Sequence, residues 1–443
     1  MLNNNENLKI YFIGIGGIGM SSLALYLKSR NFIVLGSDKI KTEQTNILEN
    51  ENIKINYESN LEDIKNSDVI IYTLALGDND KELNYAKNLC KPIYKRSQIL
   101  GMILNYFNNS VGVSGSHGKT TITSMIANIL DTSKKSFTAF IGGFDNKLSN
   151  FYTDGQKQVV VSEVCEFNRS IYDITANIGI CANIDNDHLD CYQNIENVKN
   201  AFYSFLDRSD YKIICNDDKI LKQYKGEKVL TYGIKNKSQV YAKNVTQLIG
   251  RYSFDLIIKN KNYGRINLKV FGKHNVYNAL CAVSACYLLN IPINDIIKGI
   301  TTFKGVKRRF EYIGKLYKKN IITDYAHHPT EIKSALKTAK QLFNNDLLII
   351  FEPHTYSRTK LLFYDFVNVF ENEKVCFYKT YSAREDYFYD GSSEKIAITL
   401  NKRYLESFNE VLEVIKNTKK STVLILGAGE LYDKIKTVLK NSK

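Results

Sequence analysis

Three segments of the sequence run from a short apolar strand pattern into a glycine-rich loop and then into a helical pattern. The first covers residues 8–29, the second 108–130, and the third follows Val423–Leu426. Short buried strands that alternate with helices of about 10–15 residues are typical of parallel βαβ units. No internal repeat with a period of about 20–50 residues is visible. The sequence therefore predicts an α/β chain with three separate nucleotide-fold units.

The length of 443 residues suggests two to four domains, at about 100–200 residues each. Polar residues 108–110 precede a fresh strand pattern, and a second boundary follows the basic cluster at 307–311. We predict domains at residues 1–108, 109–311 and 312–443. Residues 225–275 alternate apolar and polar side chains between Gly and Asn turns, which predicts a small β meander within the middle domain.

Composition excludes several classes of protein. An apolar content of 44% with 24% charged residues is ordinary for a globular chain and excludes a disordered one. No apolar run reaches the roughly 18–20 residues of a membrane span, and the polar first nine residues do not predict a signal peptide. The eight cysteines contain no CxxC pair, which predicts reduced thiols in the cytoplasm and argues against a zinc site.

The net charge of +14 comes from 60 basic and 46 acidic residues spread along the whole chain. This distribution favours a solvated lysine-rich surface, with a preference for polyanions such as nucleotides as the second interpretation. Nucleic acid as a partner is the weakest interpretation, because no nucleic-acid-binding signature is present.

The first glycine-rich loop has the spacing of a diphosphate site. Gly14, Gly16 and Gly19 follow a strand and open a helix, and Asp38 lies 19 residues after Gly19 at the end of the next strand pattern. Glycines let backbone N–H groups approach a pyrophosphate at a helix N-terminus, and the acid can accept from a ribose hydroxyl. The pattern leaves open whether the nucleotide is NAD or UDP-linked. The candidate residues are Gly14, Gly16, Gly17, Ile18, Gly19 and Asp38.

The loop at residues 112–121 is the strongest single signal. Its backbone N–H groups can cradle phosphates, Lys119 can neutralise β/γ charge, and the Thr120 hydroxyl can reach Mg²⁺. Val113 and the early glycine at 112 depart from the usual P-loop spacing, but the Gly-Lys-Thr core is intact. We predict ATP binding by Gly115, Ser116, His117, Gly118, Lys119, Thr120 and Thr121.

Acidic residues after the next strand patterns predict a metal position. Glu163 follows the apolar strand at residues 159–161, and His188 lies among carboxylates in the segment 183–190. A carboxylate at the end of a parallel strand beside a P-loop suits Mg²⁺. The predicted metal ligands are Thr120, Glu163 and His188, while Glu166 is a weaker candidate.

Four further polar clusters follow. Asn275 and Asn278 share one face of a helix that starts near His274 and could read an adenine edge, or could cap the helix. The basic cluster Lys307–Arg309 could bind a phosphate or an oxyanion, or form a solvated face. The segments 323–331 and 351–358 follow strand patterns, where ligands bind in doubly wound sheets.

Taken together and in order, these motifs resemble the Mur ligase family, the ATP-dependent amide-forming enzymes of peptidoglycan synthesis. The motifs are GIGGIGMSSLA from Gly14, then GSHGKTT, NIDNDHLD, FGKHNVYNAL, FKGVKRRFE, DYAHHPTEI and EPHTYSRT. The resemblance covers residues 8–433. It implies a Rossmann-like UDP-binding domain, a central ATPase domain with a mostly parallel sheet, and a Rossmann-like amino-acid domain.

The resemblance also implies a reaction and its participants. ATP would phosphorylate the carboxylate of UDP-N-acetylmuramate, and the amine of L-alanine would attack the acyl phosphate through a tetrahedral intermediate. ATP and Mg²⁺ are the implied cofactors. The implied catalytic residues are Lys119, His188, His327 and Arg358, those for ATP include His274, Asn275, Asn278 and Arg309, and those for the amino acid are Tyr325, His327 and Arg358.

Three other functions stay open at this stage. A ligase that couples the muramate to a preformed peptide would share most motifs but would need a wider acceptor pocket. An NAD-dependent oxidoreductase built on the first loop would leave Gly118, Lys119 and Thr120 unexplained. An inactive nucleotide-binding protein would not need intact Lys119, Thr120, Glu163 and His188. The sequence does not decide between a monomer and a homodimer.

Overall fold

The structure is a computed structural model that describes residues 7–77, 79–186, 189–344, 346–383 and 385–441. His188, a predicted metal ligand, therefore lies outside the described residues. The contacts of the chain divide it into two compact units. The first comprises residues 1–243, 255–266 and 277–304, and the second comprises residues 244–254, 267–276 and 305–443.

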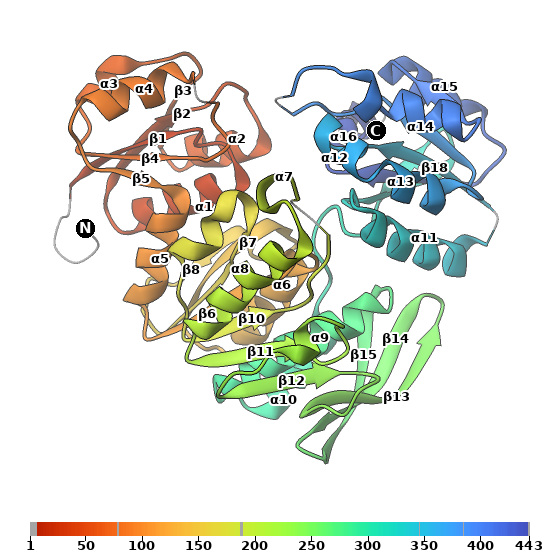
Figure 1. Ribbon diagram of the computed structural model, residues 1–443, viewed down its shortest axis with the longest axis horizontal. Helices are drawn as coiled ribbons and strands as arrows, with labels where there is room; N and C mark the ends of the chain where they lie inside the picture. Colours follow the sequence, from red (N-terminus) through yellow and green to blue (C-terminus); the bar gives the residue numbers. More distant parts are fainter. Residues whose placement is uncertain (1–6, 78, 187–188, 345, 384, 442–443) are drawn as a thin grey trace. The chain divides into compact units, whose positions relative to one another are not determined.

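The first unit begins with a five-stranded parallel sheet of order β3-β2-β1-β4-β5 within the described residues (Figure 1). The apolar strand β1 is central, and its Tyr11 and Phe12 are fully buried, as expected for a strand covered on both faces. The strands are β1 Lys9–Ile13, β2 Ile33–Ser37, β3 Lys54–Asn56, β4 Val69–Tyr72 and β5 Ile93–Lys95. The helices are α1 Ile18–Ser29, α2 Glu43–Asn50, α3 Leu61–Lys65, α4 Lys81–Asn88 and α5 Arg96–Tyr106.

A second sheet has the order β15-β14-β13-β12-β11-β10-β6-β9-β7-β8 within the described residues. The strands from β12 to β7 in this order pair in parallel, and β8 closes the edge antiparallel to β7. The strands are β6 Asn109–Ser114, β7 Phe137–Asp145, β8 Ser149–Thr153, β9 Val159–Glu163, β10 Ile178–Cys181, β11 Tyr211–Cys215, β12 Val229–Gly233, β13 Val240–Leu248, β14 Arg251–Ile258 and β15 Lys261–Phe271. The helices are α6 Lys119–Thr132, α7 Leu189–Tyr192, α8 Ile195–Asp207, α9 His274–Leu288 and α10 Ile293–Thr302, with 3₁₀ turns η1 Phe167–Asp173 and η2 Leu221–Gln223.

The predicted meander differs from the structure in one respect. Residues 225–275 contain β12, which pairs in parallel with β11 and so belongs to the parallel part of the sheet. The meander proper is β13 to β15, and these strands extend the same sheet. The alternating pattern could not separate β12 from its neighbours, because a half-covered parallel strand shows the same period.

Helix α1 joins the two sheets of the first unit. Its Tyr26 ring meets Phe140 of β7 at 5.6 Å and Phe151 of β8 at 6.4 Å, in edge-to-face contacts. The Asn150 side-chain amide donates to the Ser21 hydroxyl at 3.1 Å, and both residues are buried. Apolar burial of this kind stabilises by about 25 cal/mol per Å², so the N-terminal sheet is held on the central one.

The second unit contains a mixed sheet of order β16-β17-β21-β18-β19-β20 within the described residues, antiparallel only between β16 and β17. Alternate residues of β18 enter separate apolar clusters, Ile349 and Phe351 on one face and Ile350 on the other. The strands are β16 Glu311–Leu316, β17 Lys319–Asp324, β18 Leu347–Glu352, β19 Val375–Tyr378, β20 Arg403–Leu405 and β21 Thr422–Gly427. The helices are α11 Pro329–Phe343, α12 Tyr356–Leu361, α13 Phe363–Phe370, α14 Ser393–Thr399, α15 Phe408–Asn417 and α16 Leu431–Asn441, with the 3₁₀ turn η3 Tyr389–Gly391.

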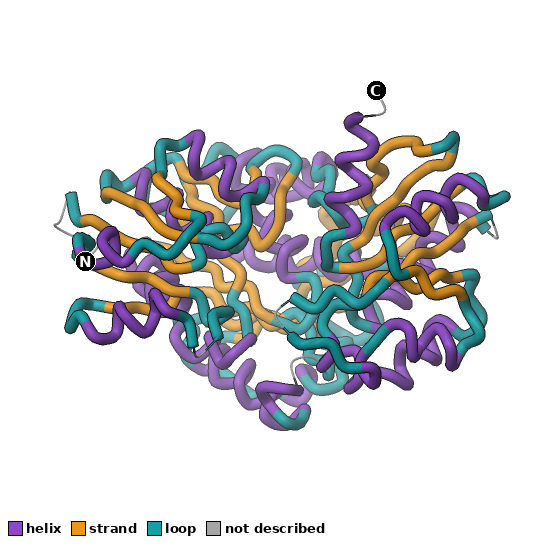
Figure 2. Tube along the Cα trace, turned by 90° about the horizontal axis from the view of Figure 1, so that it is seen from above, coloured by secondary structure: helices purple, strands orange, loops and turns teal. Residues whose placement is uncertain are grey.

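Strands and helices alternate along much of the chain, with runs of consecutive strands at β7–β9, β12–β15 and β16–β17. Figure 2 shows helices beside the strands, as expected for an α/β protein. Because the contacts place the first two sheets in one unit, the boundaries at residues 108 and 311 stay predictions. None of the helices among the described residues has the length and apolar character needed to cross a membrane.

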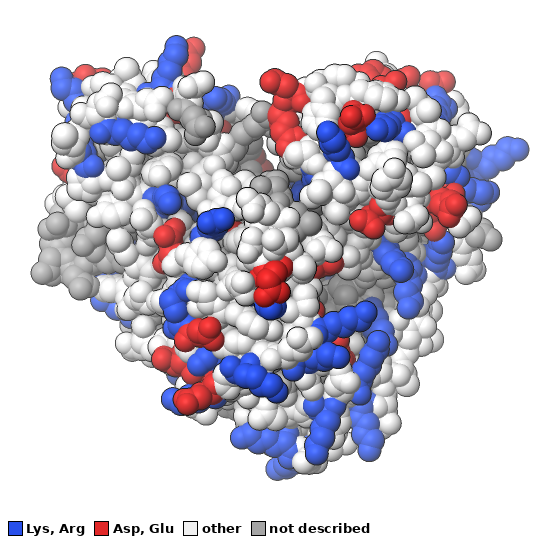
Figure 3. Space-filling view, in the orientation of Figure 1, with Lys and Arg blue, Asp and Glu red and all other residues white. Residues whose placement is uncertain are grey.

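The positive charge is spread over the surface. Figure 3 shows Lys and Arg side chains across the viewed face, densest over strands β13 to β15 and interspersed with Asp and Glu elsewhere. This distribution agrees with a solvated basic surface as the main interpretation of the +14 charge.

Candidate active site

The first glycine-rich loop turns between β1 and α1. Gly14 has a φ of +80°, and Gly17 caps α1 without a side-chain hydrogen bond. The first turn of α1 contains no acidic residue, so the favourable end of the helix dipole there is compatible with the predicted anion site. A Cβ on Gly16 would meet Thr45 at 2.8 Å and Asp38 at 2.9 Å, which explains why glycine is needed there.

Asp38 lies beside this loop, and its carboxylate accepts hydrogen bonds from backbone N–H groups of the protein itself. Its Oδ2 accepts the Gly16 N–H at 2.8 Å, and its Oδ1 accepts the Ile40 N–H at 3.3 Å. The carboxylate therefore shapes the loop. Its predicted contact to a ribose hydroxyl stays a prediction.

The second loop connects β6 to α6. Two of its glycines adopt positive φ values, which glycine allows and other residues rarely adopt. Gly115 has a φ of +130° and Gly118 a φ of +84°, and Gly118 caps α6 without a side-chain hydrogen bond. Gly112 lies inside β6, where a Cβ would meet the Phe205 ring at 2.7 Å. The early glycine of the motif is thus a packing residue, and the phosphate loop proper begins at Gly115.

The carboxyl end of β10 holds this loop in place. Asn183 accepts the His117 N–H at 2.8 Å through its side chain and the Ser116 N–H at 3.1 Å through its backbone. His117 Nε2 lies 3.0 Å from Asp185 Oδ2. Two neighbouring parallel strands therefore present their polar ends together, as switch-point sites require.

Lys119 and Glu166 form an ion pair inside the loop. Lys119 Nζ lies 2.9 Å and 3.1 Å from the two Glu166 oxygens, and it donates to the Gly115 carbonyl at 2.6 Å. The Glu166 side chain is 2% exposed and that of Lys119 is 16% exposed. The weaker acidic candidate of the sequence is thus the direct partner of the predicted phosphate-binding lysine.

Glu163 ends β9, next to the loop strand β6, with which it is in register at Val113. Its carboxylate accepts the Gly142 N–H of β7. Thr120 is buried in the first turn of α6. Carboxylate and hydroxyl oxygens are the hard ligands that Mg²⁺ prefers, so these residues suit the predicted metal.

Asn278 of α9 lies against the phosphate loop. A Cβ on Gly118 would approach the Asn278 side-chain oxygen to 2.8 Å. The first unit therefore brings together Asn278 with the loop glycine, as an ATP site requires.

His274 and Asn275, which are also predicted to contact ATP, belong to the second unit, as does Arg309. Asn275 donates from its side-chain amide to the Phe271 carbonyl at 2.6 Å and lies 3.2 Å from His274 Nε2. His274 Nδ1 lies 2.8 Å from the Ser334 hydroxyl. Both side chains have partners in their own unit, and their contacts to ATP stay predictions.

Stacked cations and aromatic rings organise the second unit. The Arg308 guanidinium lies 4.9 Å from the Tyr325 ring centre and 4.7 Å from that of Tyr432. Arg308 also donates to the Gly427 and Gly429 carbonyls at 3.2 Å and 3.0 Å. Arg309 covers Tyr325 at 5.1 Å. The basic cluster is therefore a structured group rather than a solvated face.

The two adjacent histidines have different environments. His328 caps α11 and accepts the Thr330 N–H with its Nδ1 at 3.3 Å, and its side chain is buried. His327 lies against the Tyr325 ring at 5.4 Å and the His354 ring at 6.0 Å, and its Nδ1 is 3.5 Å from Glu331. Of the two histidines, His327 is the one that contacts the rings of Tyr325 and His354, which we call the aromatic cluster.

His354 and Arg358 lie near each other after β18. Burial lowers the pKa of His354 to about 3, and the charges of His327, Arg358 and Arg308 act in the same direction. Its buried Nδ1 has no hydrogen-bond partner among the described residues. A neutral imidazole in this position offers a nitrogen that can accept a hydrogen bond.

Glu352, at the end of β18, is a buried acid that the sequence analysis did not select. It is 2% exposed, and its Oε2 accepts the Leu431 N–H at 3.2 Å. Burial raises its pKa to about 7. The sequence signal that could have identified Glu352 is its position at the end of an apolar strand.

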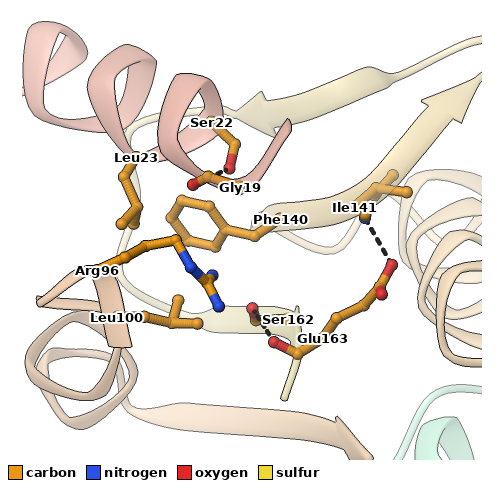
Figure 4. A pocket seen from close by; sticks show the side chains of 10 residues that line it. Gly19, Ser22, Leu23, Arg96, Leu100, Phe140, Ile141, Ser162 and Glu163 are labelled. Carbon is orange, nitrogen blue, oxygen red and sulfur yellow. Dashed lines mark hydrogen bonds between the residues drawn. The ribbon is translucent and has the colours of Figure 1, made fainter. Parts of the chain in front are cut away.

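A pocket in the first unit also contains a residue that sequence reasoning missed. It lies between α1, α5, β7 and β9, and Arg96 lines it opposite Glu163 (Figure 4). The lining residues are Gly19, Ser22, Leu23, Arg96, Leu100, Phe140, Ile141, Gly142, Ser162 and Glu163. The sequence offered no motif at Arg96, because its position depends on how α5 packs beside α1.

Three family profiles match the chain along nearly its whole length. They are the Mur ligase family catalytic domain over residues 9–108, the Mur ligase middle domain over 113–286, and the Mur ligase glutamate ligase domain over 308–429. The chain is 36% identical to the UDP-N-acetylmuramate–L-alanine ligase of Caldicellulosiruptor saccharolyticus, over 98% of this chain and 99% of that one. It is 37% identical to the enzyme of the same name from Caldanaerobacter subterraneus, over 98% of each chain.

Solved structures have the same three-domain α/β fold. A UDP-N-acetylmuramate–alanine ligase from Thermotoga maritima is similar with a TM-score of 0.83 and 28% identity, over 99% of this chain and 100% of that one. A murein peptide ligase from Psychrobacter arcticus has the same fold, with a TM-score of 0.75 and 21% identity over 98% of each chain. From these matches over its three domains, the chain belongs to the Mur ligase family.

Proposed function

We propose that this protein is an ATP-dependent ligase that joins L-alanine to UDP-N-acetylmuramate in the synthesis of peptidoglycan precursors. The observation that carries the proposal is the phosphate loop with its Lys119–Glu166 pair beside Glu163. It occurs in a chain that is 36–37% identical, over nearly its full length, to enzymes named for this reaction.

The chemistry explains why ATP is consumed. A carboxylate is a poor acyl donor, because oxide is a poor leaving group. In the first step a carboxylate oxygen of the substrate forms a bond to the γ-phosphorus, and the bond between that phosphorus and the β–γ bridging oxygen breaks, which releases ADP. In the second step the amine of L-alanine forms a bond to the acyl carbon, phosphate leaves, and the amine loses a proton.

Residues of the phosphate loop support the first step. In this proposal the loop from Gly115 to Gly118 cradles the phosphates. The Ser116 and His117 N–H groups donate to Asn183 in this structure, so their contribution requires exchange of that partner, just as Lys119 must exchange Glu166 for phosphate oxygens. Such placed charges supply most of the catalysis in phosphoryl transfer. We place the remaining ATP contacts at Thr120, Thr121, His274, Asn275, Asn278 and Arg309.

Thr120, Glu163 and His188 would hold Mg²⁺, which offsets charge on the phosphates when bound. Thr120 and Glu163 are supported by their positions at the start of α6 and the end of β9. His188 rests on the sequence motif alone.

The nucleotide sugar binds the first loop in this proposal. The start of α1 without acidic residues suits a diphosphate, and Gly14, Gly16, Gly17, Ile18, Gly19 and Asp38 form the site. Residues 1–108 are the UDP-binding domain, 109–311 the ATP-binding domain and 312–443 the amino-acid domain.

The second unit supplies the amine in this proposal. Tyr325, His327 and Arg358 contact L-alanine, with Arg358 opposite its carboxylate. His327 is the candidate base that takes the proton of the amine, because it faces the aromatic cluster whereas His328 is used as a helix cap.

A ligase for a preformed peptide is the second candidate. The fold of the murein peptide ligase supports it, but that structure is less similar, with a TM-score of 0.75 against 0.83. The proposed enzyme works in the cytoplasm, where the eight cysteines, all free in the structure, stay reduced.

The test is phosphate release by the full chain with ATP, Mg²⁺ and UDP-N-acetylmuramate. We expect release only after L-alanine is added. Dependence on a peptide instead of L-alanine would select the second candidate, and release without any amine acceptor would contradict both.

A further inference from the structure

The first residue of α5 is a cation, Arg96, and α5 contains no acidic residue that could balance its charge. Arg96 is the first residue of α5, it follows Lys95, and the first turn contains no acidic residue. A positive charge at this end of a helix is unfavourable, because the helix dipole is also positive there. Among the described residues, no hydrogen bond or ion pair involves the Arg96 guanidinium.

Arg96 is half-buried and lines the pocket between the two sheets of the first unit. A Cβ on Gly19 would lie 3.0 Å from Arg96 Nη1, so the side chain passes directly over the first turn of α1. Figure 4 shows the guanidinium pointing across the pocket toward Ser162 and Glu163. Two helix starts without acidic residues therefore meet at this pocket, at Gly19 and at Arg96.

Apolar side chains and one carboxylate line much of the rest of the pocket. Leu23, Leu100 and Phe140 give it an apolar wall. Glu163 is its carboxylate, and it accepts the Gly142 N–H on the far side. A guanidinium in such a setting binds a carboxylate through two parallel hydrogen bonds.

The pocket extends from the proposed nucleotide-sugar site to the proposed phosphoryl-transfer site. Gly19 is the last glycine of the first loop, and Glu163 is paired in register with β6, the strand that leads into the phosphate loop. The acid group that ATP activates must approach that loop, whereas the diphosphate lies at the other end near Gly16 and Gly17.

We propose that Arg96 binds the carboxylate of the nucleotide-sugar acid and presents it for phosphorylation. The inference rests on the proposed function and names one further substrate-binding residue for it. Arg96 thus selects for an acid-bearing sugar over the same nucleotide sugar without the acid.

The experiment measures equilibrium binding of two ligands to the full-length protein, without ATP. UDP-N-acetylmuramate carries the acid, and UDP-N-acetylglucosamine has the same diphosphate and sugar ring but lacks it. We expect Arg96→Gln to weaken binding of the first ligand by about 10- to 100-fold, as for the loss of a charged hydrogen bond, and to leave the second unchanged. Arg96→Lys, which keeps the charge but not the paired geometry, falls between.

Arg30→Ala is the matched control, since Arg30 lies at the opposite end of α1 and its guanidinium contacts Tyr106. This variant should bind both ligands as the wild type does. Melting temperatures of all variants within a few degrees of the wild type would exclude misfolding, and Arg96→Lys serves if Arg96→Gln fails to fold.

Three outcomes overturn the inference. Equal weakening of both ligands would assign Arg96 to the diphosphate, and no weakening of either would exclude it from the site. If wild-type protein binds neither ligand and releases no phosphate with L-alanine, the proposed function fails as well, and the two failures are thereby told apart.

Discussion

The Lys119 ammonium lies 2.9 Å from the Glu166 carboxylate, and both groups are largely removed from solvent. The pair also joins two strand ends, because Lys119 begins α6 after β6 and Glu166 follows β9. In the proposed ATP complex, phosphate oxygens replace Glu166 as the partner of Lys119. The buried pair makes the loop sensitive to the removal of either member.

Lys119→Ala should abolish turnover and destabilise the protein for separate reasons. The loss of the phosphate-binding charge should lower the rate of L-alanine-dependent phosphate release by about 10³-fold or more. The buried Glu166 carboxylate would also lose its charged partner Lys119, at a cost of up to about 3–5 kcal/mol. The double variant Lys119→Ala/Glu166→Gln should recover most of the melting temperature and none of the activity. Near-normal turnover in either variant would contradict the role of Lys119.

Gly118→Ala should reduce ATP affinity. Gly118 has a φ of +84°, and the added Cβ would press on Asn278. Strain of about 1–2 kcal/mol in the left-handed region predicts an affinity loss of about tenfold, measured by nucleotide binding. Gly155→Ala is the control, because Gly155 has a φ of +81° with no atom within 4 Å of an added Cβ. Equal ATP affinity of the two variants would contradict the role of Gly118 in binding the nucleotide.

The sequence could predict where the residues of the proposed phosphate site lie, because their placement is set locally. A glycine loop, a lysine and a threonine follow one strand, and the apolar run of β9 places Glu163 at the neighbouring strand end. Arg96 could not be found in this way, since α5 has an ordinary helical pattern and only its packing beside α1 and β7 makes Arg96 line a pocket. The hydrogen bond from the Gly16 N–H to the Asp38 carboxylate likewise depends on the spacing of β1 and β2, which the sequence pattern does not give.

The adjacent histidines should separate catalysis from stability. His327→Gln should lower the rate of amide formation by about 10²–10⁴-fold, as expected for the loss of a general base, with ATP binding unchanged. His328→Gln should cost about 0.5–2 kcal/mol of stability through the lost helix cap, with an unchanged KM for L-alanine. Steady-state kinetics and melting curves measure both effects, and a selective loss of turnover in His328→Gln would reverse the two roles.

Glu352 should make the stability of the second unit depend on pH. Its pKa is raised by burial from 4.5 to about 7, with Glu430 acting in the same direction and Arg308 and the Leu431 and Glu430 N–H groups opposing it. The folded chain therefore holds this proton more tightly than the unfolded chain. The resulting stability is fully present below pH 4.5 and is lost as the pH rises through about 7, by roughly 3 kcal/mol for this group.

Glu352→Gln should remove that dependence while keeping an oxygen that can accept the Leu431 N–H. We expect the variant and the wild type to melt at similar temperatures at pH 5, and the variant to melt several degrees higher at pH 8, because the wild type then carries a buried charge. Glu371→Gln, which removes the same charge from an exposed position, should melt like the wild type at both pH values. Parallel melting curves of Glu352→Gln and the wild type across this range would show that Glu352 is not held in its protonated form by burial.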